Sequence, residues 1–358
     1  MTQAVSIAQG GTNNVTMRNR IINGSMIIDQ RNAGASVSIG TTAFPVDRFS
    51  ASIQQGSGHT GQRSTTAPSG FVNSVLITIG TGASPAAGNV SRLVQIIEGF
   101  NVADFGWGTA SAATITLSFW VRSSVTGTFA GGIYNGASNR TYVFTYAISA
   151  ANTWEQKSIT IAGDTSGTWA TDNSVGFVVN WDLGTGSTYQ GTAGSWAAGA
   201  AWATSGSVKL AATSGATFYI TGVQLEAGTT ATPFENRLYG TEFALCQRYY
   251  YRISAAGGQY THFGSGYINS VSSAQVLTVF PVTMRVPPTA VEQSGTATHY
   301  GVLNLNTSTI SNVVPSFSYA DSWSARTAFN TASTLTAGQG SVGRAESTLA
   351  YLGWSAEL

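Results

Sequence analysis

The densest set of residues that could do chemistry lies in one stretch of the chain and consists of aromatic rings and a carboxylate. The members are Trp181, Asp182, Tyr189, Trp196 and Trp202. Flat aromatic faces can stack on the C–H groups of a sugar ring, and carboxylates can accept hydrogen bonds from its hydroxyls. The loop tryptophans have mostly Gly and Ala neighbours, which favours partial exposure. The set predicts a carbohydrate-binding site. The alternative is that these rings plug one end of a domain or a subunit interface.

Patterns for catalysis are weaker. Hydrolysis of a polysaccharide needs two positioned carboxylates. The candidate carboxylates are scattered, and no motif supports a pair among them: Glu155, Asp164, Asp172 and Asp182. We therefore predict a protein that is not an enzyme.

Metal and cofactor patterns are also weak. The three histidines are far apart in the sequence, and Cys246 is the single cysteine, which excludes a cysteine-based zinc cluster. A structural Ca²⁺ held by loop carboxylates and carbonyls is possible, although no clustered ligand set points to one. We expect no cofactor.

The composition describes a neutral, glycine-rich protein. Of 358 residues, 42 are Gly, only 9% are charged and 11% are aromatic, and the net charge is +1. Without a run of basic residues, no electrostatic footprint for nucleic acid is present. No segment approaches the ~20 apolar residues of a membrane span, and no signal segment is visible at the N-terminus. We expect synthesis in a cytoplasm and no membrane insertion.

Secondary structure is predicted to be almost entirely β. Short apolar runs recur along the chain, and Gly, Ser, Thr or Asn stands in nearly every gap, as in β-sandwiches. The segment 114–120 alternates, with Ile115, Leu117 and Phe119 on one face. We assign Trp120 and Trp154, which lie in such strands, to the core together with Phe119.

Two further segments are ambiguous or irregular. The segment 91–100 fits either a helix or a strand, and its β-branched residues favour a strand; 101–105 could hold one helical turn. The segment 184–206 is the longest stretch without strand character. A loop of this length in a compact domain is unusual unless it is functional or packs on its own side chains.

The organising element is the segment 217–234, TFYITGVQLEAGTTATPF. It begins as a strand with Tyr219, Thr221, Val223 and Leu225 on one face. Ala227-Gly228 ends the strand, and Pro233 favours an extended connector. We predict an N-terminal arm at residues 1–17, a first β-domain at 18–237 and a second, smaller β-sandwich at 238–358.

Several segments carry a resemblance to a known class of protein. NRIINGSMIIDQRNAG (19–34) and FYITGVQLEAGTTATPFE (218–235) resemble the first and last strands of a jelly-roll module. That module is similar to carbohydrate-binding domains and occurs in bacteriophage tail-fibre and other virion-surface proteins. LYGTEFALCQRYYYRI (238–253) and FPVTMRVPPT (280–289) resemble the C-terminal module of such proteins. The resemblance covers nearly the whole chain, and its motifs are structural.

The resemblance implies a location on the virion surface and an all-β fold, a jelly-roll β-sandwich followed by a smaller sandwich. We accordingly predict a non-enzymatic tail fibre or receptor-binding protein that attaches the phage to host surface polysaccharide. It also implies a homotrimer, and an N-terminal arm that binds other virion proteins. Two alternatives stay open: a capsid-decorating or head-fibre protein that binds other virion proteins, and a polysaccharide depolymerase.

Overall fold

The computed structural model describes residues 17–258, 260–332 and 334–358. The predicted N-terminal arm at 1–17 lies outside these residues, apart from Met17. The chain divides into two compact units: the first ends at Arg237, and the second spans Leu238–Glu357. Both are built from β-sheets, so the predicted all-β fold is confirmed.

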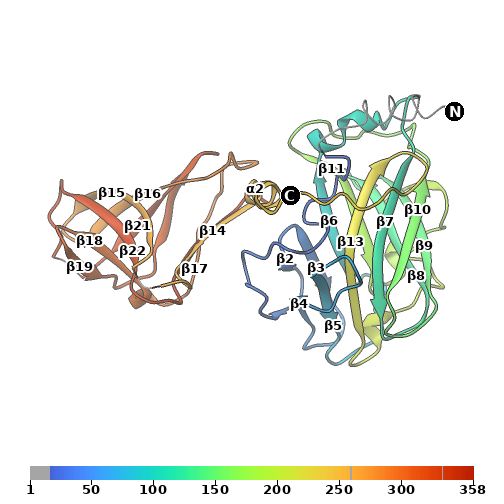
Figure 1. Ribbon diagram of the computed structural model, residues 1–358, viewed down its shortest axis with the longest axis horizontal. Helices are drawn as coiled ribbons and strands as arrows, with labels where there is room; N and C mark the ends of the chain where they lie inside the picture. The colour runs from blue at the N-terminus through green and yellow to red at the C-terminus, as the bar shows by residue number, and fades with distance from the viewer. Residues whose placement is uncertain (1–16, 259, 333) are drawn as a thin grey trace. The chain divides into compact units, whose positions relative to one another are not determined.

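The first unit contains two antiparallel sheets (Figure 1). The β13 sheet has the strand order β1 (Val37–Ser38), β4 (Thr60–Ser64), β5 (Ser74–Thr78), β13 (Thr217–Ala227), β7 (Ile115–Ser123), β10 (Glu155–Ile161). The β11 sheet has the order β12 (Trp196–Ala198), β9 (Arg140–Ile148), β8 (Gly127–Asn135), β11 (Val175–Asp182), β6 (Ser91–Glu98), β3 (Phe49–Ile53), β2 (Ala43–Val46). Short 3₁₀ turns connect some of them: η1 (Gly99–Asn101), η2 (Ala103–Phe105), η3 (Ser187–Tyr189), η4 (Leu210–Ala212).

One hydrophobic core lies between these two sheets, because alternate residues of each strand point inward. In β7 the buried hydrophobic residues are Ile115, Leu117, Phe119 and Val121. Each such side chain contributes roughly 1.5–3 kcal/mol by leaving water. The intervening residues of β7 lie on the outer face of the β13 sheet.

Strand β13 contains a β-bulge that the sequence did not reveal. Its register with β7 shifts between Thr221 and Gln224, and Gly222 adopts a left-handed φ of 60°. The extra residue shifts the in–out alternation of the strand by one position. Phe218 and Ile220 before the bulge and Val223 and Leu225 after it are therefore all buried. The prediction that Val223 and Leu225 share a face with Tyr219 was therefore wrong.

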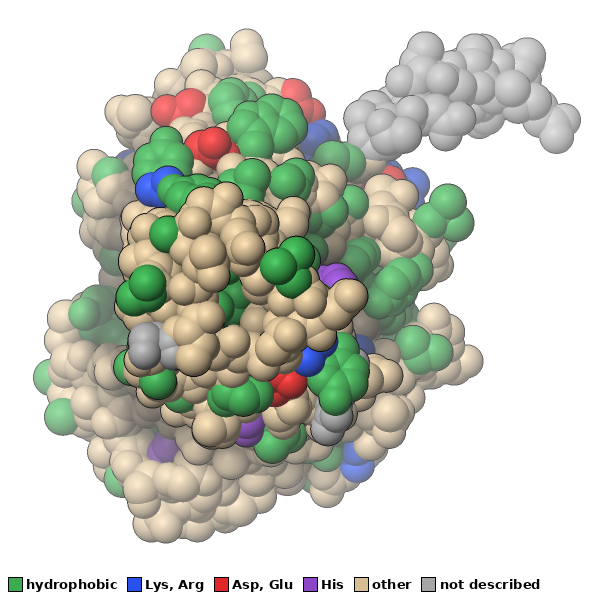
Figure 2. All heavy atoms as spheres, turned by 90° about the vertical axis from the view of Figure 1, so that its left-hand side faces the viewer, with side chains coloured by type: hydrophobic (Ala, Val, Ile, Leu, Met, Phe, Trp, Pro, Cys, Tyr) green, Lys and Arg blue, Asp and Glu red, His purple; other side chains and the backbone are tan. Residues whose placement is uncertain are grey.

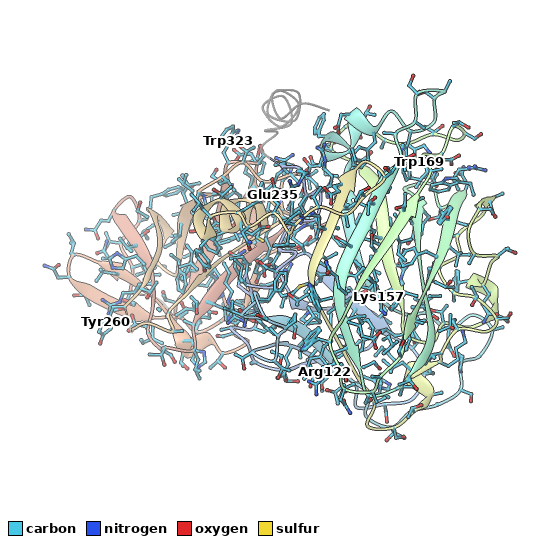
Figure 3. All side chains as sticks on the ribbon, turned by 45° about the vertical axis from the view of Figure 1, so that its right-hand side comes forward. Arg122, Lys157, Trp169, Glu235, Tyr260 and Trp323 are labelled. Carbon is cyan, nitrogen blue, oxygen red and sulfur yellow. The ribbon has the colours of Figure 1, made fainter. Side chains whose placement is uncertain are left out.

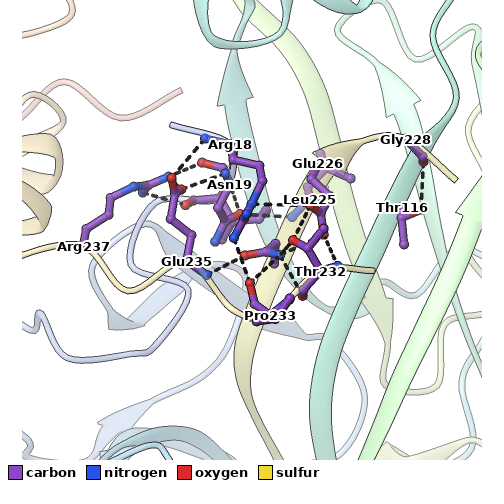
Figure 4. Close-up of polar contacts among 12 residues, drawn as sticks. Arg18, Asn19, Thr116, Leu225, Glu226, Gly228, Thr232, Pro233, Glu235 and Arg237 are labelled. Atoms are coloured by element: carbon purple, nitrogen blue, oxygen red, sulfur yellow. Dashed lines mark hydrogen bonds and ion pairs between the residues drawn. The ribbon is translucent and has the colours of Figure 1, made fainter. Parts of the chain in front are cut away.

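A polar clamp joins the start of the first unit to the segment after β13 (Figure 4). The carboxylate of Glu235 accepts hydrogen bonds from the backbone N–H groups of Arg18 (3.2 Å) and Asn19 (2.8 Å). The Asn19 side chain bonds in turn to the backbone of Val223 and Leu225. The two ends of the unit thus close on each other through charge-assisted bonds.

The second unit contains two antiparallel sheets and one helix. The β23 sheet has the order β14 (Tyr250–Ser254), β23 (Tyr351–Ser355), β17 (Glu292–Gln293). The β16 sheet has the order β19 (Thr307–Ile310), β18 (Tyr300–Asn304), β22 (Gly340–Ala345), β15 (His262–Ser270), β16 (Ser273–Val279), β21 (Ser324–Asn330), β20 (Ser316–Ala320). The remaining elements are α2 (Tyr239–Gln247) and η5 (Ala297–His299).

Two ambiguous segments and one irregular segment were singled out in the sequence, and the structure assigns each of them. Residues 91–98 of the ambiguous segment form strand β6 and its last two residues belong to η1, whereas the expected helical turn within 101–105 is η2. The segment 184–206 is not wholly irregular, because it contains η3 and β12. None of the described helices has the length and hydrophobicity needed to cross a membrane. In the view of Figure 2 the surface is mostly polar and uncharged, with scattered hydrophobic side chains.

Candidate functional site

Trp181 does not face solvent. It is fully buried on the inner face of β11, and its ring lies 6.2 Å from that of Phe49 and 5.8 Å from that of Phe119. These rings belong to the hydrophobic core of the first unit. This burial contradicts the predicted sugar contact of Trp181, and the residue stabilises the fold.

Asp182 is also fully buried, and it anchors the segment that follows it. Its Oδ1 accepts hydrogen bonds from the N–H groups of Gly184 (3.1 Å) and Thr185 (2.8 Å). Its Oδ2 accepts one from the Ser207 hydroxyl (3.1 Å) and lies 3.8 Å from Nζ of Lys209. One carboxylate thus holds both ends of the 184–206 segment. A sugar hydroxyl cannot reach it, which contradicts the predicted sugar contact.

Trp202 and Tyr189 are brought together as a stacked pair, with ring centroids 4.5 Å apart. Trp202 is only 3% exposed, and its Nε1 donates to the Thr185 hydroxyl at 2.9 Å. The Arg92 guanidinium lies 4.4 Å from the same ring. The Trp202 ring thus contacts both Tyr189 and Arg92. The predicted exposure of Trp202 was wrong, whereas Tyr189 is half-buried.

Trp196 belongs to a different aromatic cluster. Its half-buried ring lies 5.1 Å from Trp107 and 5.6 Å from Trp169, and its Nε1 donates to the carbonyl of Ala162 at 2.8 Å. The structure therefore distributes the five predicted residues among the core, the loop anchor and two aromatic clusters. They do not form a single exposed site.

A row of half-buried side chains, two of them aromatic, lies on the outer face of the β13 sheet; one member, Arg122, is labelled in Figure 3. Tyr219 in β13 pairs with Arg122 in β7 on one side and with Leu76 in β5 on the other. Glu155 pairs with Val121, which places Trp154 next to Arg122 on the same face. All four side chains are half-buried. We call Trp154, Arg122, Tyr219 and Leu76 the Trp154 row.

The members of the Trp154 row contact one another. The rings of Trp154 and Tyr219 are edge to face with centroids 6.1 Å apart, and the Arg122 guanidinium lies 4.9 Å from the Tyr219 ring centre. Nε of Arg122 donates to the carbonyl of Asn152 at 2.9 Å. Asn152 has a φ of 56°, which asparagine tolerates, and its N–H bonds to the carbonyl of Ser123. The row is therefore held in place before any ligand arrives.

The segment after β13 covers part of this face, away from the Trp154 row. The hydroxyls of Thr116 and Thr160 donate to the carbonyls of Gly228 and Thr229. Trp120 lies between this covered part and the Trp154 row, where it packs with Phe71 near Gly222. The row thus occupies the part of the sheet where aromatic faces reach solvent.

Sequence reasoning placed Trp120 and Trp154 in the core, and the structure places both, half-buried, on the outer face. The signal that could have shown this is the alternation itself. Ile115, Leu117 and Phe119 point inward, so Trp120 must point outward. Trp107 and Trp354, in contrast, are buried, as is Phe119.

The candidate catalytic carboxylates are each used in local structure. Glu155 pairs with Lys157 at 2.6 Å, and Asp164 makes a two-bond pair with Arg140 at 2.7 Å. Asp172 accepts bonds from Ser174. Among the described residues, no group of three or more His, Cys, Asp or Glu side chains is close enough to hold a metal ion.

Comparisons with known proteins find structural similarity at low sequence identity. A putative sugar binding protein from Bacteroides thetaiotaomicron has a TM-score of 0.31 and 12% identity, over 59% of this chain and 100% of that chain. A family 11 carbohydrate-binding module from Clostridium thermocellum, solved with a β-1,3-1,4-mixed-linked tetrasaccharide, has a TM-score of 0.29 and 11% identity, over 56% and 100%.

The enzymatically active domain of tailspike protein 4 from bacteriophage CBA120 has a TM-score of 0.30 and 12% identity. That match covers 59% of this chain but only 21% of the tailspike chain. No family model and no curated protein matches the sequence. At these scores, no ligand and no residue role is carried over to this chain.

Proposed function

We propose that this chain is a non-enzymatic glycan-binding protein of a bacteriophage virion surface, a tail fibre or receptor-binding component. The observation that carries the glycan-binding proposal is the Trp154 row. Two half-buried aromatic rings, Trp154 and Tyr219, lie side by side on the outer face of the sheet, beside the guanidinium of Arg122. This is the combination that sugar recognition needs, because a sugar ring offers both C–H faces and hydroxyls. The virion location rests on the sequence resemblance described above.

Each such contact would be weak, since the row is open and shallow. We propose that the protein acts as a homotrimer, with several copies on each particle. Multivalent attachment raises apparent affinity by about 10²- to 10⁴-fold when the sites are engaged together. Weak binding of a glycan at each row is therefore compatible with firm attachment to a cell surface on which the same glycan occurs many times.

A second candidate function is binding to other virion proteins. It is favoured by exposed hydrophobic side chains on the second unit, among them Val279, Tyr319 and Trp323, which are 59–68% exposed. Exposed apolar residues that form a contiguous patch often mark protein contacts. A depolymerase is less well supported, because the candidate carboxylates anchor local structure and show no pairing.

The experiment that tests the proposal is a glycan array with the purified chain and its Trp154→Ala variant. We expect the wild type to bind and the variant to lose about 2 kcal/mol, roughly 30-fold in Kd, as for tryptophans that dominate interfaces. The matched control is Trp323→Ala, which removes an exposed tryptophan from the second unit.

Three other outcomes would count against the proposal. Equal loss of binding in both tryptophan variants would show that the Trp154 row is not the glycan-binding site. Absence of binding by the wild type would favour the virion-assembly role. Shortened glycans recovered from the array would show that the protein is an enzyme.

A further inference from the structure

We infer that the glycan recognised at the Trp154 row carries a carboxylate, as uronic and sialic acids do, and that Arg122 binds this group. The inference rests on the proposed glycan-binding function and specifies the class of sugar. The evidence for it is the set of hydrogen bonds that Arg122 makes and the donor groups on its side chain that have no partner.

Arg122 keeps most of its hydrogen-bonding capacity free. Its Nε donates to Asn152, and among the described residues neither Nη1 nor Nη2 has a hydrogen bond or an ion pair. Two other arginines of the first unit have more partners. Arg140 forms its fork with Asp164, and Arg237 bonds to Glu235 and to the carbonyl of Ile21.

The orientation of Arg122 suits a planar anion. Its guanidinium lies over the Tyr219 ring, and the Nε bond to Asn152 limits its rotation. A guanidinium presents parallel N–H groups that match the two oxygens of a carboxylate. A sugar ring stacked on the neighbouring Trp154 could place an acidic substituent within reach of this fork.

The surroundings of Arg122 favour an anion as well. The outward residues beside the row are uncharged: Gln156 pairs with Trp120, and Gln62 pairs with Leu76. Glu155, the carboxylate next to Trp154 in the sequence, already binds Lys157. No described carboxylate pairs with Arg122 within ion-pair distance, so an acidic ligand would supply its missing partner and meet little repulsion.

A purely structural role makes a different prediction. If Arg122 only packs on Tyr219, its loss would displace the Tyr219 ring and weaken binding to acidic and neutral glycans alike. If it binds a carboxylate, its loss would weaken binding to acidic glycans more than binding to neutral ones. The test must therefore compare glycans that differ in the carboxylate alone.

The experiment measures binding to acidic glycans and to the same glycans after reduction of each carboxyl group to an alcohol. The array carries uronic-acid and sialic-acid glycans in both forms. We expect the wild type to prefer the acidic form by about 10- to 100-fold, the value of a charge-assisted hydrogen-bond pair. Arg122→Gln should remove this preference, so that the variant binds the acidic and the reduced forms with equal affinity.

Two further variants complete the test. Arg122→Lys keeps the charge but loses the fork, so it should retain only part of the preference. Arg326→Gln is the control for net charge, because Arg326 is an exposed arginine of the second unit. It should bind as the wild type does.

The outcomes separate this inference from the function on which it rests. Equal wild-type binding to acidic and reduced glycans, lost in Trp154→Ala, would overturn the carboxylate assignment and keep the glycan-binding proposal. A preference for acidic glycans that persists in Arg122→Gln would overturn the role of Arg122. Wild-type protein that binds no glycan in either form would overturn both.

Discussion

Replacement of Trp181 by alanine is expected to destabilise the first unit by about 3–5 kcal/mol, the usual cost of removing a buried tryptophan. The ring is fully buried among Phe49 and Phe119, and a cavity in this rigid core could not collapse completely. Because whole domains are stable by only about 5–15 kcal/mol, the loss is a large share of the total. Urea unfolding of the full chain, followed by tryptophan fluorescence and circular dichroism, measures it.

The matched control is Trp154→Ala, in which the removed ring is half-buried on the outer face. Its cost should be well below that of Trp181→Ala, at about 1 kcal/mol, since less surface returns to water. Trp181→Phe should fall between the two, because it keeps an aromatic ring in the core. If Trp181→Ala instead unfolded like the wild type and lost glycan binding, our original assignment of Trp181 to the sugar site would be restored.

The alternation of apolar residues was enough to predict the fold class. Strand β6 could be separated from a helix by its β-branched residues, and the inward residues of β7 follow directly from their spacing. These are local properties, and local properties are what a sequence shows most directly.

The candidate site depended on contacts between distant segments. Trp202 has small neighbours in the sequence, which suggested exposure, but it packs against Gly132 of β8. A Cβ at Gly132 would lie 2.8 Å from the Cα of Trp202, so the missing side chain makes room for the loop. Nothing in the local sequence of the loop indicates that Gly132 faces it.

The bulge in β13 is a second feature that could not be predicted from the sequence. A strict period of two assigned Val223 and Leu225 to the wrong face, because one extra residue near Gly222 reverses the phase. Glycine in a strand is a known signal for a bulge, so the possibility could have been considered. Its position relative to β7 depends on pairing, which the sequence does not display.

Replacement of Asp182 by alanine should have the second large effect on stability, at about 3 kcal/mol or more, because each buried polar group left without a partner costs about 1–3 kcal/mol. The change leaves the N–H groups of Gly184 and Thr185 without their acceptor and removes an acceptor of the Ser207 hydroxyl. Both ends of the 184–206 segment would be released, so hydrogen exchange should increase there first. Asp182→Asn keeps one oxygen for the two N–H groups and should lose less. Wild-type exchange rates in Asp182→Ala would contradict the role of Asp182 as an anchor.

The same carboxyl gives the stability a pH dependence whose sign follows from its burial. Burial raises the pKa of Asp182 above its ordinary value of 3.8, although hydrogen bonds from Thr185 and Gly184 and the charge of Lys209 oppose the rise. The folded chain therefore holds this proton more firmly than the unfolded chain does. The stabilisation from this group is complete below the ordinary pKa and is lost as the pH rises through the raised one. The Asn variant has no such proton, so the stability of the wild type relative to Asp182→Asn should decline as the pH rises across this window. Thermal unfolding of both proteins at a series of pH values measures the difference, and a difference that grows with pH would show that the carboxylate form is the one that folding favours.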